Sequence, residues 1–209
     1  MTTSLRLHRH PLSGHCHRVE LLLSLLGLRF ERIEVDLSRR AHKTPEFLAQ
    51  NAFGQVPVLE DAGLAIADSN AILVYLARRY DASEQWFPPD PVSAARVQRW
   101  LSIAAGPLAS GPAAARLAAV FGAKLDRAHA LSVGRELYRV LDAELRARAF
   151  LVGDAPTIAD VALYSYTAHA PEGGLSLEAY PSIRSWLARI EALPGFVPMQ
   201  ASPVAPEAS

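Results

Sequence analysis

A serine and a cysteine stand where the first strand of the chain is expected to turn into a helix. Residues 5–10 read as a short strand, and residues 11–19 read as a turn entering a helix, with Ser13 and Cys16 spaced Ser-x-x-Cys at its start. The first turn of a helix presents unpaired amide groups and the positive end of the helix dipole, which favour an anion. A thiol in such a place can also be reactive. Ser13 and Cys16 are therefore candidate catalytic residues.

Pro57 is the second informative residue, because it opens a short apolar strand and has no N–H to donate to a sheet. It belongs to the run Asn-Ala-Phe-Gly-Gln-Val-Pro-Val-Leu-Glu at residues 51–60. A proline at such a turn is a candidate for the cis isomer, which exposes the backbone N–H and C=O of Val56. An exposed backbone edge of this kind can pair with a peptide.

Composition excludes several classes of protein. The 209 residues are 50% hydrophobic, which indicates a folded globular protein with one sizeable core or two small ones. The 21 basic and 21 acidic side chains cancel, so no long-range field recruits nucleic acid or an anionic membrane. The single cysteine cannot form an internal disulfide, the N-terminus lacks the apolar stretch of a signal peptide, and the apolar run at residues 21–26 is too short to span a bilayer. These features predict a cytoplasmic protein.

The expected secondary structure changes character once along the chain. Residues 1–80 predict a small α/β domain, residues 81–91 with three prolines predict a linker, and residues 92–209 predict an all-helical domain. The expected strands are 5–9, 29–35, 57–60 and 64–67, and the expected helices are 15–26, 45–50, 69–79, 92–105, 112–122, 126–148, 157–168 and 180–192. Pro107 and Pro112, with Gly106 and Gly111, are expected to break or kink the first helix of the second domain.

A capping box is expected at residues 157–160, Thr-Ile-Ala-Asp, at the start of the helix 157–168. Thr157 accepts a hydrogen bond from the Asp160 amide in this motif, and the Asp160 carboxylate reaches back to the Thr157 amide. Its expected role is structural.

Four motifs, taken in order, resemble those of the cytosolic glutathione S-transferases. They are Ser-Gly-His-Cys-His-Arg-Val at 13–19, Gly-Gln-Val-Pro-Val-Leu-Glu at 54–60, Asp-Ser-Asn-Ala-Ile at 68–72 and Thr-Ile-Ala-Asp at 157–160. The resemblance implies a thioredoxin-like α/β N-terminal domain, an all-α C-terminal domain, glutathione as the bound thiol and a homodimer. No tyrosine lies near the first strand, which favours the serine-type members of the family, the theta, zeta and related bacterial forms.

The resemblance implies that Ser13 hydrogen-bonds the thiolate of glutathione. A thiol with a pKa of about 8.5 is mostly protonated at neutral pH and must be ionised to attack. Cys16 leaves an alternative open, because a reactive thiol there would form a mixed disulfide with glutathione and make the protein a thiol transferase. A small buried side chain that only packs is the other reading of Cys16.

Four histidines cluster in sequence near the first strand: His8, His10, His15 and His17. The two that flank Cys16 could tune a thiol or orient a substrate. Their spacing does not supply a closed ligand set, so no metal is expected.

The binding of the tripeptide needs polar anchors, and the resemblance places them in the first domain. Val56, beside Pro57, is expected to pair its backbone with the cysteinyl part of glutathione. Asp68 and Ser69 fall at a strand-to-helix turn, where Asp68 can take the ammonium of the γ-glutamyl group and Ser69 its carboxylate. The glycyl carboxylate is expected to bind at His42, Lys43 and Gln55.

The second substrate is expected to be a small hydrophobic electrophile in a pocket between the domains, with Arg116 as its one charged candidate residue. An exposed helix residue is the other reading of Arg116. The leading functional prediction is a glutathione transferase that conjugates glutathione to such electrophiles. The alternatives are a glutathione-dependent thiol transferase, peroxidase or isomerase, and a non-catalytic regulatory or assembly protein of the same fold.

Overall fold

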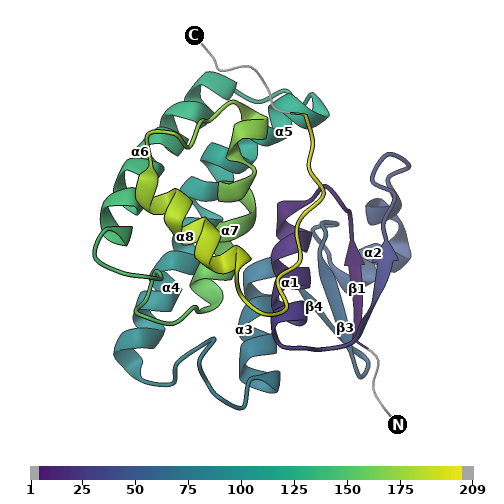
Figure 1. Cartoon of the computed structure of the whole chain (residues 1–209). Helices are drawn as coiled ribbons and strands as arrows, with labels where there is room; N and C mark the ends of the chain where they lie inside the picture. Colours follow the sequence, from purple (N-terminus) through teal and green to yellow (C-terminus); the bar gives the residue numbers. More distant parts are fainter. Residues whose placement is uncertain (1–4, 204–209) are drawn as a thin grey trace. The chain divides into compact units, whose positions relative to one another are not determined.

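The structure is a computed structural model that describes residues 5–203 (Figure 1). The chain divides into two compact units: unit 1 contains the residues up to Ala82 together with Pro194–Gln200, and unit 2 contains Ser83–Leu193 and the residues from Ala201. The sequence-based boundaries placed Pro194–Gln200 in the helical domain, whereas this segment clusters with unit 1. This segment is held on unit 1 because the side chains of Ser24 and His17, in the first helix, donate hydrogen bonds to two of its backbone carbonyls.

Unit 1 is an α/β unit built on a sheet of four strands. Its elements are β1 (Leu5–Arg9), α1 (Gly14–Leu25), β2 (Phe30–Glu34), η1 (Ala41–Lys43), α2 (Pro45–Gln50), β3 (Val58–Asp61), β4 (Leu64–Ala67) and α3 (Ser69–Tyr80). The strand order is β2-β1-β3-β4; β1 runs parallel to β2 and antiparallel to β3, and β3 is antiparallel to β4. This is the mixed sheet of a thioredoxin-like domain.

The alternation of side chains along β1 explains how the helices cover the sheet. Leu5 and Leu7 are buried on the face that α1 and α3 cover, while the His8 ring lies on the other face, edge-on to Phe47 of α2. Phe47 packs there with Val58. The N-termini of α1 and α3 both follow a strand, so the turns that carry the candidate residues rest on a packed core (Figure 1).

Unit 2 is helical. Its elements are α4 (Pro91–Ala105), η2 (Ala109–Ala113), α5 (Ala114–Phe121), α6 (Arg127–Leu145), α7 (Ile158–Ala168), η3 (Ala170–Gly173) and α8 (Pro181–Glu191). The break expected near Pro112 is present as a π-helical turn, η2, that contains this proline. Proline lacks the N–H that an α-helix needs at this position, so the wider turn is a physical consequence of the sequence.

The buried carboxylate of Asp160 accepts hydrogen bonds from three segments of unit 2. The predicted capping box is present, with the Thr157 amide donating to Asp160 Oδ2 at 2.8 Å. Asp160 Oδ1 also accepts the Leu151 amide and the Trp186 indole N–H, each at 2.9 Å. One buried carboxylate therefore fixes the start of α7, the preceding loop and α8 together.

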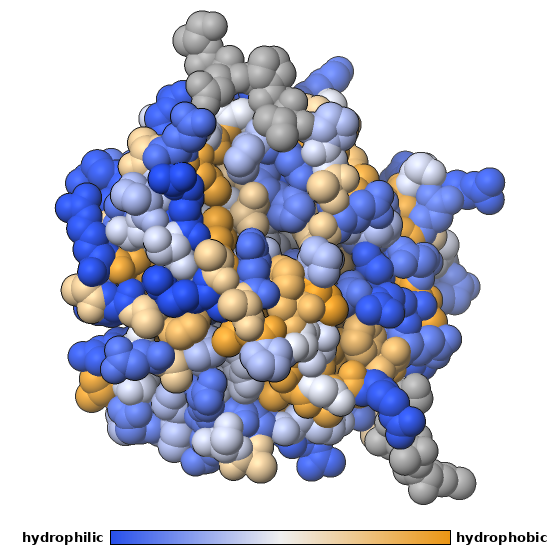
Figure 2. All heavy atoms as spheres, in the orientation of Figure 1, coloured by the Kyte–Doolittle hydropathy of each residue, from blue (hydrophilic) through white to orange (hydrophobic). Residues whose placement is uncertain are grey.

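The strands and helices expected from the sequence are confirmed, with ends that differ by a few residues at most. No helix within residues 5–203 is long and apolar enough to cross a membrane. On the face drawn in Figure 2, hydrophilic side chains are interspersed with apolar ones.

Candidate active site

Ser13 is the N-cap of α1. Its backbone is extended, and its side-chain oxygen accepts the amide N–H of Cys16 at 3.3 Å. A hydroxyl has one proton and two lone pairs, so accepting this amide leaves the proton available for another partner. Ser13 is half-buried at the positive end of a twelve-residue helix. The arrangement can hold a thiolate.

Cys16 lies one turn further along α1 and points into the core. Its side chain is fully buried, and the His10 amide donates to its sulfur at 3.4 Å. Burial raises the pKa of Cys16 to about 11, so the thiol is protonated at neutral pH. A buried neutral thiol is a poor nucleophile, and this environment favours the packing role over the reactive one.

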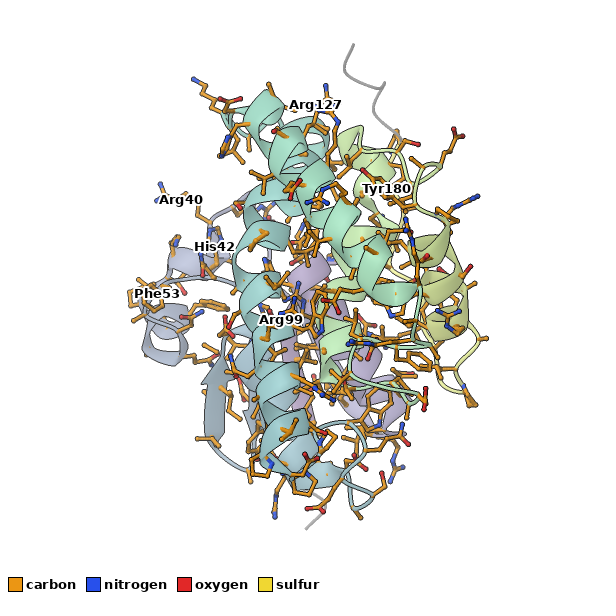
Figure 3. All side chains as sticks on the ribbon, turned by 90° about the vertical axis from the view of Figure 1, so that its left-hand side faces the viewer. Arg40, His42, Phe53, Arg99, Arg127 and Tyr180 are labelled. Atoms are coloured by element: carbon orange, nitrogen blue, oxygen red, sulfur yellow. The ribbon has the colours of Figure 1, made fainter. Side chains whose placement is uncertain are left out.

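The loop after α2 brings together the three residues predicted to bind the glycyl carboxylate. Gly54 has a positive φ of 56°, and a Cβ at this position would lie 2.6 Å from the His42 carbonyl oxygen and 2.8 Å from Lys43 Nζ. Lys43 Nζ donates to the Phe53 carbonyl at 2.9 Å. The loop therefore packs directly on η1, and Gln55 follows next in the chain. Figure 3 shows His42 and Phe53 on this side of unit 1.

The His42 ring is half-buried and neutral. Burial, followed by the charges of Lys43 and Arg40, lowers its pKa below the ordinary value. Its Nδ1 is buried and has no hydrogen-bond partner among the residues that the structure describes. A ligand that reaches η1 can thus use Lys43 as its cation and His42 as a neutral hydrogen-bonding group.

Val56 and Pro57 form the entry to β3. The peptide bond between them is cis, as the sequence predicted. The Asn51 side chain donates to the Gln55 carbonyl at 2.8 Å and so holds the preceding turn. Within residues 5–203, no hydrogen bond uses the backbone N–H or C=O of Val56, so this edge is available for strand-like pairing.

Asp68 and Ser69 start α3. Asp68 adopts a positive φ of 72°, an uncommon conformation for a residue other than glycine, and its Oδ1 accepts the amides of Asn70 and Ala71, both at 2.9 Å. Asp68 is exposed and Ser69 is buried. Asp68 therefore caps α3 through Oδ1.

The Ser69 hydroxyl has two neighbours from α1 that the sequence did not assign to the site. Arg18 Nη1 lies 3.4 Å from Ser69 Oγ and also donates to Asn70 Oδ1 at 2.9 Å. His15 Nδ1 lies 3.3 Å from the same oxygen. The spacing of His15 and Arg18, three residues apart on a helix, was the one available signal that they share a face.

Arg116 lies in unit 2 on α5 and is almost completely buried. Its Nε pairs with Glu172 Oε2 at 2.5 Å, and Glu172 Oε1 contacts His169 Nδ1 at 2.6 Å and accepts the Ser202 amide at 2.9 Å. Gly173 packs so closely that a Cβ there would lie 2.7 Å from the Arg116 amide nitrogen. This environment favours a structural role for Arg116, and its predicted place in an electrophile pocket stays a prediction.

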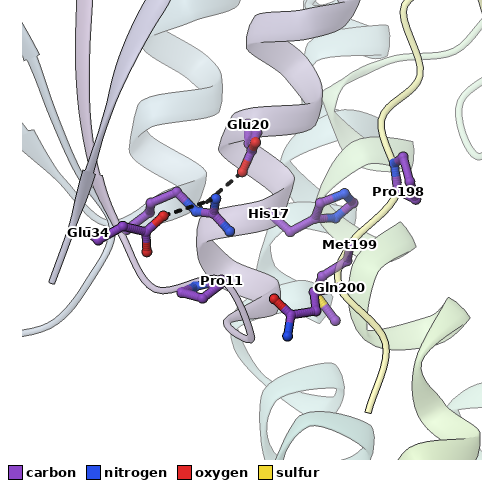
Figure 4. Close-up of a pocket in the computed structure, with 8 residues that line it drawn as sticks. Pro11, His17, Glu20, Glu34, Pro198, Met199 and Gln200 are labelled. Carbon is purple, nitrogen blue, oxygen red and sulfur yellow. Dashed lines mark ion pairs between the residues drawn. The ribbon is translucent and has the colours of Figure 1, made fainter. Parts of the chain in front are cut away.

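A polar cavity of about 550 Å³ lies in unit 1 beside α1 (Figure 4). Arg9 lies at its wall and pairs with Glu20 at 3.4 Å and with Glu34 at 3.3 Å. The remaining lining comes from the turn before α1, from α1 itself and from the C-terminal segment: Pro11, His17, Pro198, Met199 and Gln200. Such a charged lining does not match a small hydrophobic electrophile.

No group of three or more His, Cys, Asp or Glu side chains in the described part of the chain is arranged to hold a metal ion.

Comparisons with known proteins agree with this arrangement. The family model for the glutathione S-transferase N-terminal domain matches residues 3–78, and the model for the C-terminal domain of the same family matches residues 122–194. Glutathione S-transferase 3 of Zea mays is 35% identical over 203 residues, which cover 92% of this chain and 91% of the relative. Glutathione S-transferase theta-2 of Rattus norvegicus is 29% identical and covers 91% of this chain and 82% of the relative.

Solved structures give the same result. A glutathione S-transferase from Pseudomonas fluorescens has a TM-score of 0.87 and 34% identity, with 93% of this chain and 98% of that one covered. A glutathione transferase homologue from Drosophila mojavensis, solved with bound glutathione, has a TM-score of 0.84 and 26% identity, with 92% and 90% covered. Both domains, their order and the thioredoxin-like sheet are thus shared, and the chain belongs to the glutathione S-transferase family of enzymes.

Proposed function

We propose that the chain binds glutathione in unit 1, ionises its thiol with the Ser13 hydroxyl, and conjugates the thiolate to a small hydrophobic electrophile. The observation that supports the proposal is the geometry of Ser13, whose oxygen caps α1 and whose hydroxyl can donate its proton to a bound sulfur. Each pK unit by which the thiol is lowered requires about 1.4 kcal/mol of differential stabilisation. One charge-assisted hydrogen bond of about 1.5–3 kcal/mol supplies one to two units, and the helix dipole adds to it.

Three sets of residues in unit 1 support the binding of the tripeptide. The Val56 backbone edge suits the cysteinyl group, Asp68 and Ser69 suit the ends of the γ-glutamyl group, and the loop on η1 suits the glycyl carboxylate at His42, Lys43 and Gln55. The related Drosophila mojavensis structure contains glutathione, which supports the same ligand here.

Proximity accounts for the rest of the catalysis. Once the thiolate is fixed at the start of α1, an electrophile held beside it reacts in an effectively unimolecular step. Stabilisation of the thiolate by Ser13 would also support isomerase and peroxidase reactions. The pocket that binds the second substrate therefore determines which class of electrophile reacts. Thiol transfer through Cys16 is disfavoured, because its sulfur is inaccessible and protonated.

A cytoplasmic homodimer is part of the proposal. The Phe53 side chain is 82% exposed. Its backbone is held on both sides, because the Asn51 side chain accepts a hydrogen bond from its amide and Lys43 donates one to its carbonyl. A large apolar side chain held rigidly in solvent is typical of an interface anchor.

An activity panel tests the proposed function. Purified protein is assayed with glutathione and a haloarene, an epoxide, an organic peroxide and a mixed disulfide, each with Ser13→Ala and Cys16→Ser beside the wild type. We expect activity with at least one electrophile, a loss of about 10- to 100-fold in Ser13→Ala and little change in Cys16→Ser. Activity with the mixed disulfide alone, abolished by Cys16→Ser, would show that the protein is a thiol transferase instead.

A further inference from the structure

The environment of Ser69 raises a question about its single hydroxyl proton. Ser69 is 4% exposed, and two side chains of α1 approach its oxygen, Arg18 Nη1 at 3.4 Å and His15 Nδ1 at 3.3 Å. Arg18 is also buried and is held in place through Asn70 Oδ1 at 2.9 Å. Arg18 had no predicted role, and His15 was predicted only as a residue that could tune a thiol or orient a substrate, although both lie within the first two turns after Ser13.

The direction of one of these two contacts is fixed by chemistry. A guanidinium has no acceptor, so Arg18 donates to Ser69 Oγ and uses one of its lone pairs. His15 can act in two ways through the same nitrogen. With hydrogen on Nδ1 the ring donates to the second lone pair, and the Ser69 proton points elsewhere. With hydrogen on Nε2 the ring accepts that proton, and Ser69 has none to offer a ligand.

We propose that His15 is a positioning residue for glutathione binding, which, as the Nδ1–H tautomer, turns the Ser69 hydroxyl proton toward the γ-glutamyl carboxylate. Arg18 and His15 then both donate to Ser69, and Ser69 donates to the ligand. The two neutral tautomers differ only in the position of one proton, so a bound carboxylate selects the competent one without a change of charge. This role rests on the proposed assignment of Ser69 to that carboxylate.

The electrostatic surroundings of His15 fit a neutral ring. Burial, followed by the charge of Arg18, lowers the pKa of His15 to about 3, so the ring is neutral at neutral pH and both tautomers are open to it. Arg18 supplies the fixed positive charge behind the hydroxyl. The ligand carboxylate is thus met by a hydroxyl that two donors polarise in the same direction.

The test compares two ligands that differ only at the group in question. Calorimetry measures the affinity for glutathione and for the same tripeptide without the α-carboxylate of its glutamyl residue, 4-aminobutyryl-cysteinyl-glycine. His15→Leu removes both hydrogen-bonding functions of the ring. We expect it to weaken glutathione binding by about tenfold and to change the affinity for the analogue by less than about twofold.

Two matched variants separate the positioning role from packing. His15→Asn places an amide near the position of Nδ1 and should restore most of the affinity for glutathione. His17→Leu changes a histidine two residues away on the same helix, whose Nε2 bonds the Val197 carbonyl at 2.9 Å, and should leave the preference for the carboxylate unchanged. Thermal unfolding shows which variants fold, and His15→Ala replaces His15→Leu if the latter does not.

Ser69→Ala distinguishes the two levels of the proposal. If Ser69→Ala abolishes the preference for the carboxylate while His15→Leu and His15→Ala keep it, the positioning role is overturned and the proposed function stands. If Ser69→Ala itself keeps the full preference, the γ-glutamyl anchor is misassigned and the role of His15 fails with it. An equal loss for both ligands in the His15 variants also overturns the positioning role.

Discussion

The Ser13 hydroxyl accepts the Cys16 amide at 3.3 Å, so the residue proposed to ionise glutathione is also the cap of the helix that positions it. The two functions use different parts of one hydroxyl, the oxygen for the helix and the proton for the ligand. The Cys16 side chain meanwhile is fully buried in the core. The Ser-x-x-Cys spacing therefore places the hydroxyl that we propose to be catalytic one helical turn from a buried thiol.

The inertness of Cys16 gives the first prediction. It is the only cysteine of the chain, so thiol labelling reports on it alone. Because burial raises its pKa to about 11, native protein at pH 8 should react with iodoacetamide at least about 100-fold more slowly than the urea-unfolded chain. Mass spectrometry of timed samples measures this. Rapid labelling of the native protein would show that the sulfur is accessible and would restore Cys16 as a candidate nucleophile.

His15 predicts a pH dependence of stability. Its pKa is about 3 in the folded protein and 6.5 as the ordinary value, so between these pH values the unfolded chain binds the extra proton. Stability therefore falls as the pH drops below about 6.5, with a slope of up to about 1.4 kcal/mol per pH unit from this group. His15→Asn removes the contribution. Urea unfolding at several pH values from 7.5 to about 4.5 should show the wild-type slope exceeding that of the variant. Parallel curves for the two proteins would contradict the assignment.

Asp160 predicts a large stability effect in unit 2. Its carboxylate serves donors from Leu151, Thr157 and Trp186, and it is 1% exposed. Asp160→Ala leaves these donors unsatisfied and should lower the free energy of unfolding by about 3–5 kcal/mol. Thr157→Ala, which removes the cap hydroxyl and leaves the Asp160 carboxylate in place, should cost about 1 kcal/mol. Denaturant titration checks both values. Equal losses of stability in the two variants would contradict the conclusion that the Asp160 carboxylate holds three segments of unit 2 together.

Phe53 predicts the assembly state. If its exposed ring anchors a homodimer, wild-type protein at micromolar concentration should sediment with a mass near twice 22.6 kDa, and Phe53→Ser should shift the equilibrium toward monomer. Leu64→Ser, at a half-exposed side chain on the β3–β4 hairpin of the same unit, is the matched control and should stay dimeric. A monomeric wild type with full activity would contradict the dimer.

The local features of the fold could be predicted because their causes are local. The period of apolar residues gave the helices and strands, the capping box at residues 157–160 fixed the start of α7, and Pro57 marked the entry to β3. The π-helical form of η2 could not be predicted from the sequence, because Pro112 indicates only that a regular α-helix cannot continue.

Pairings between distant segments could not be predicted. His17 and Val197 are 180 residues apart, and Arg116 and Glu172 are 56 apart. The sequence pattern around a histidine or arginine on a helix is the same whether its side chain faces solvent or contacts a distant carbonyl or carboxylate. For the same reason the sequence did not predict the contacts of His15 and Arg18 with Ser69. These contacts form only because α1 packs on α3.

The most direct test of the central claim is the pKa of the thiol of glutathione bound to the enzyme, measured by ultraviolet titration of the thiolate. The wild-type complex should titrate well below the ordinary value of about 8.5. The complex of Ser13→Ala should titrate one to two units higher than the wild type, with the affinity for glutathione largely retained because the other anchors are intact. An unchanged thiol pKa in Ser13→Ala would contradict the account, because the hydroxyl at the start of α1 would then not be the group that ionises the thiol.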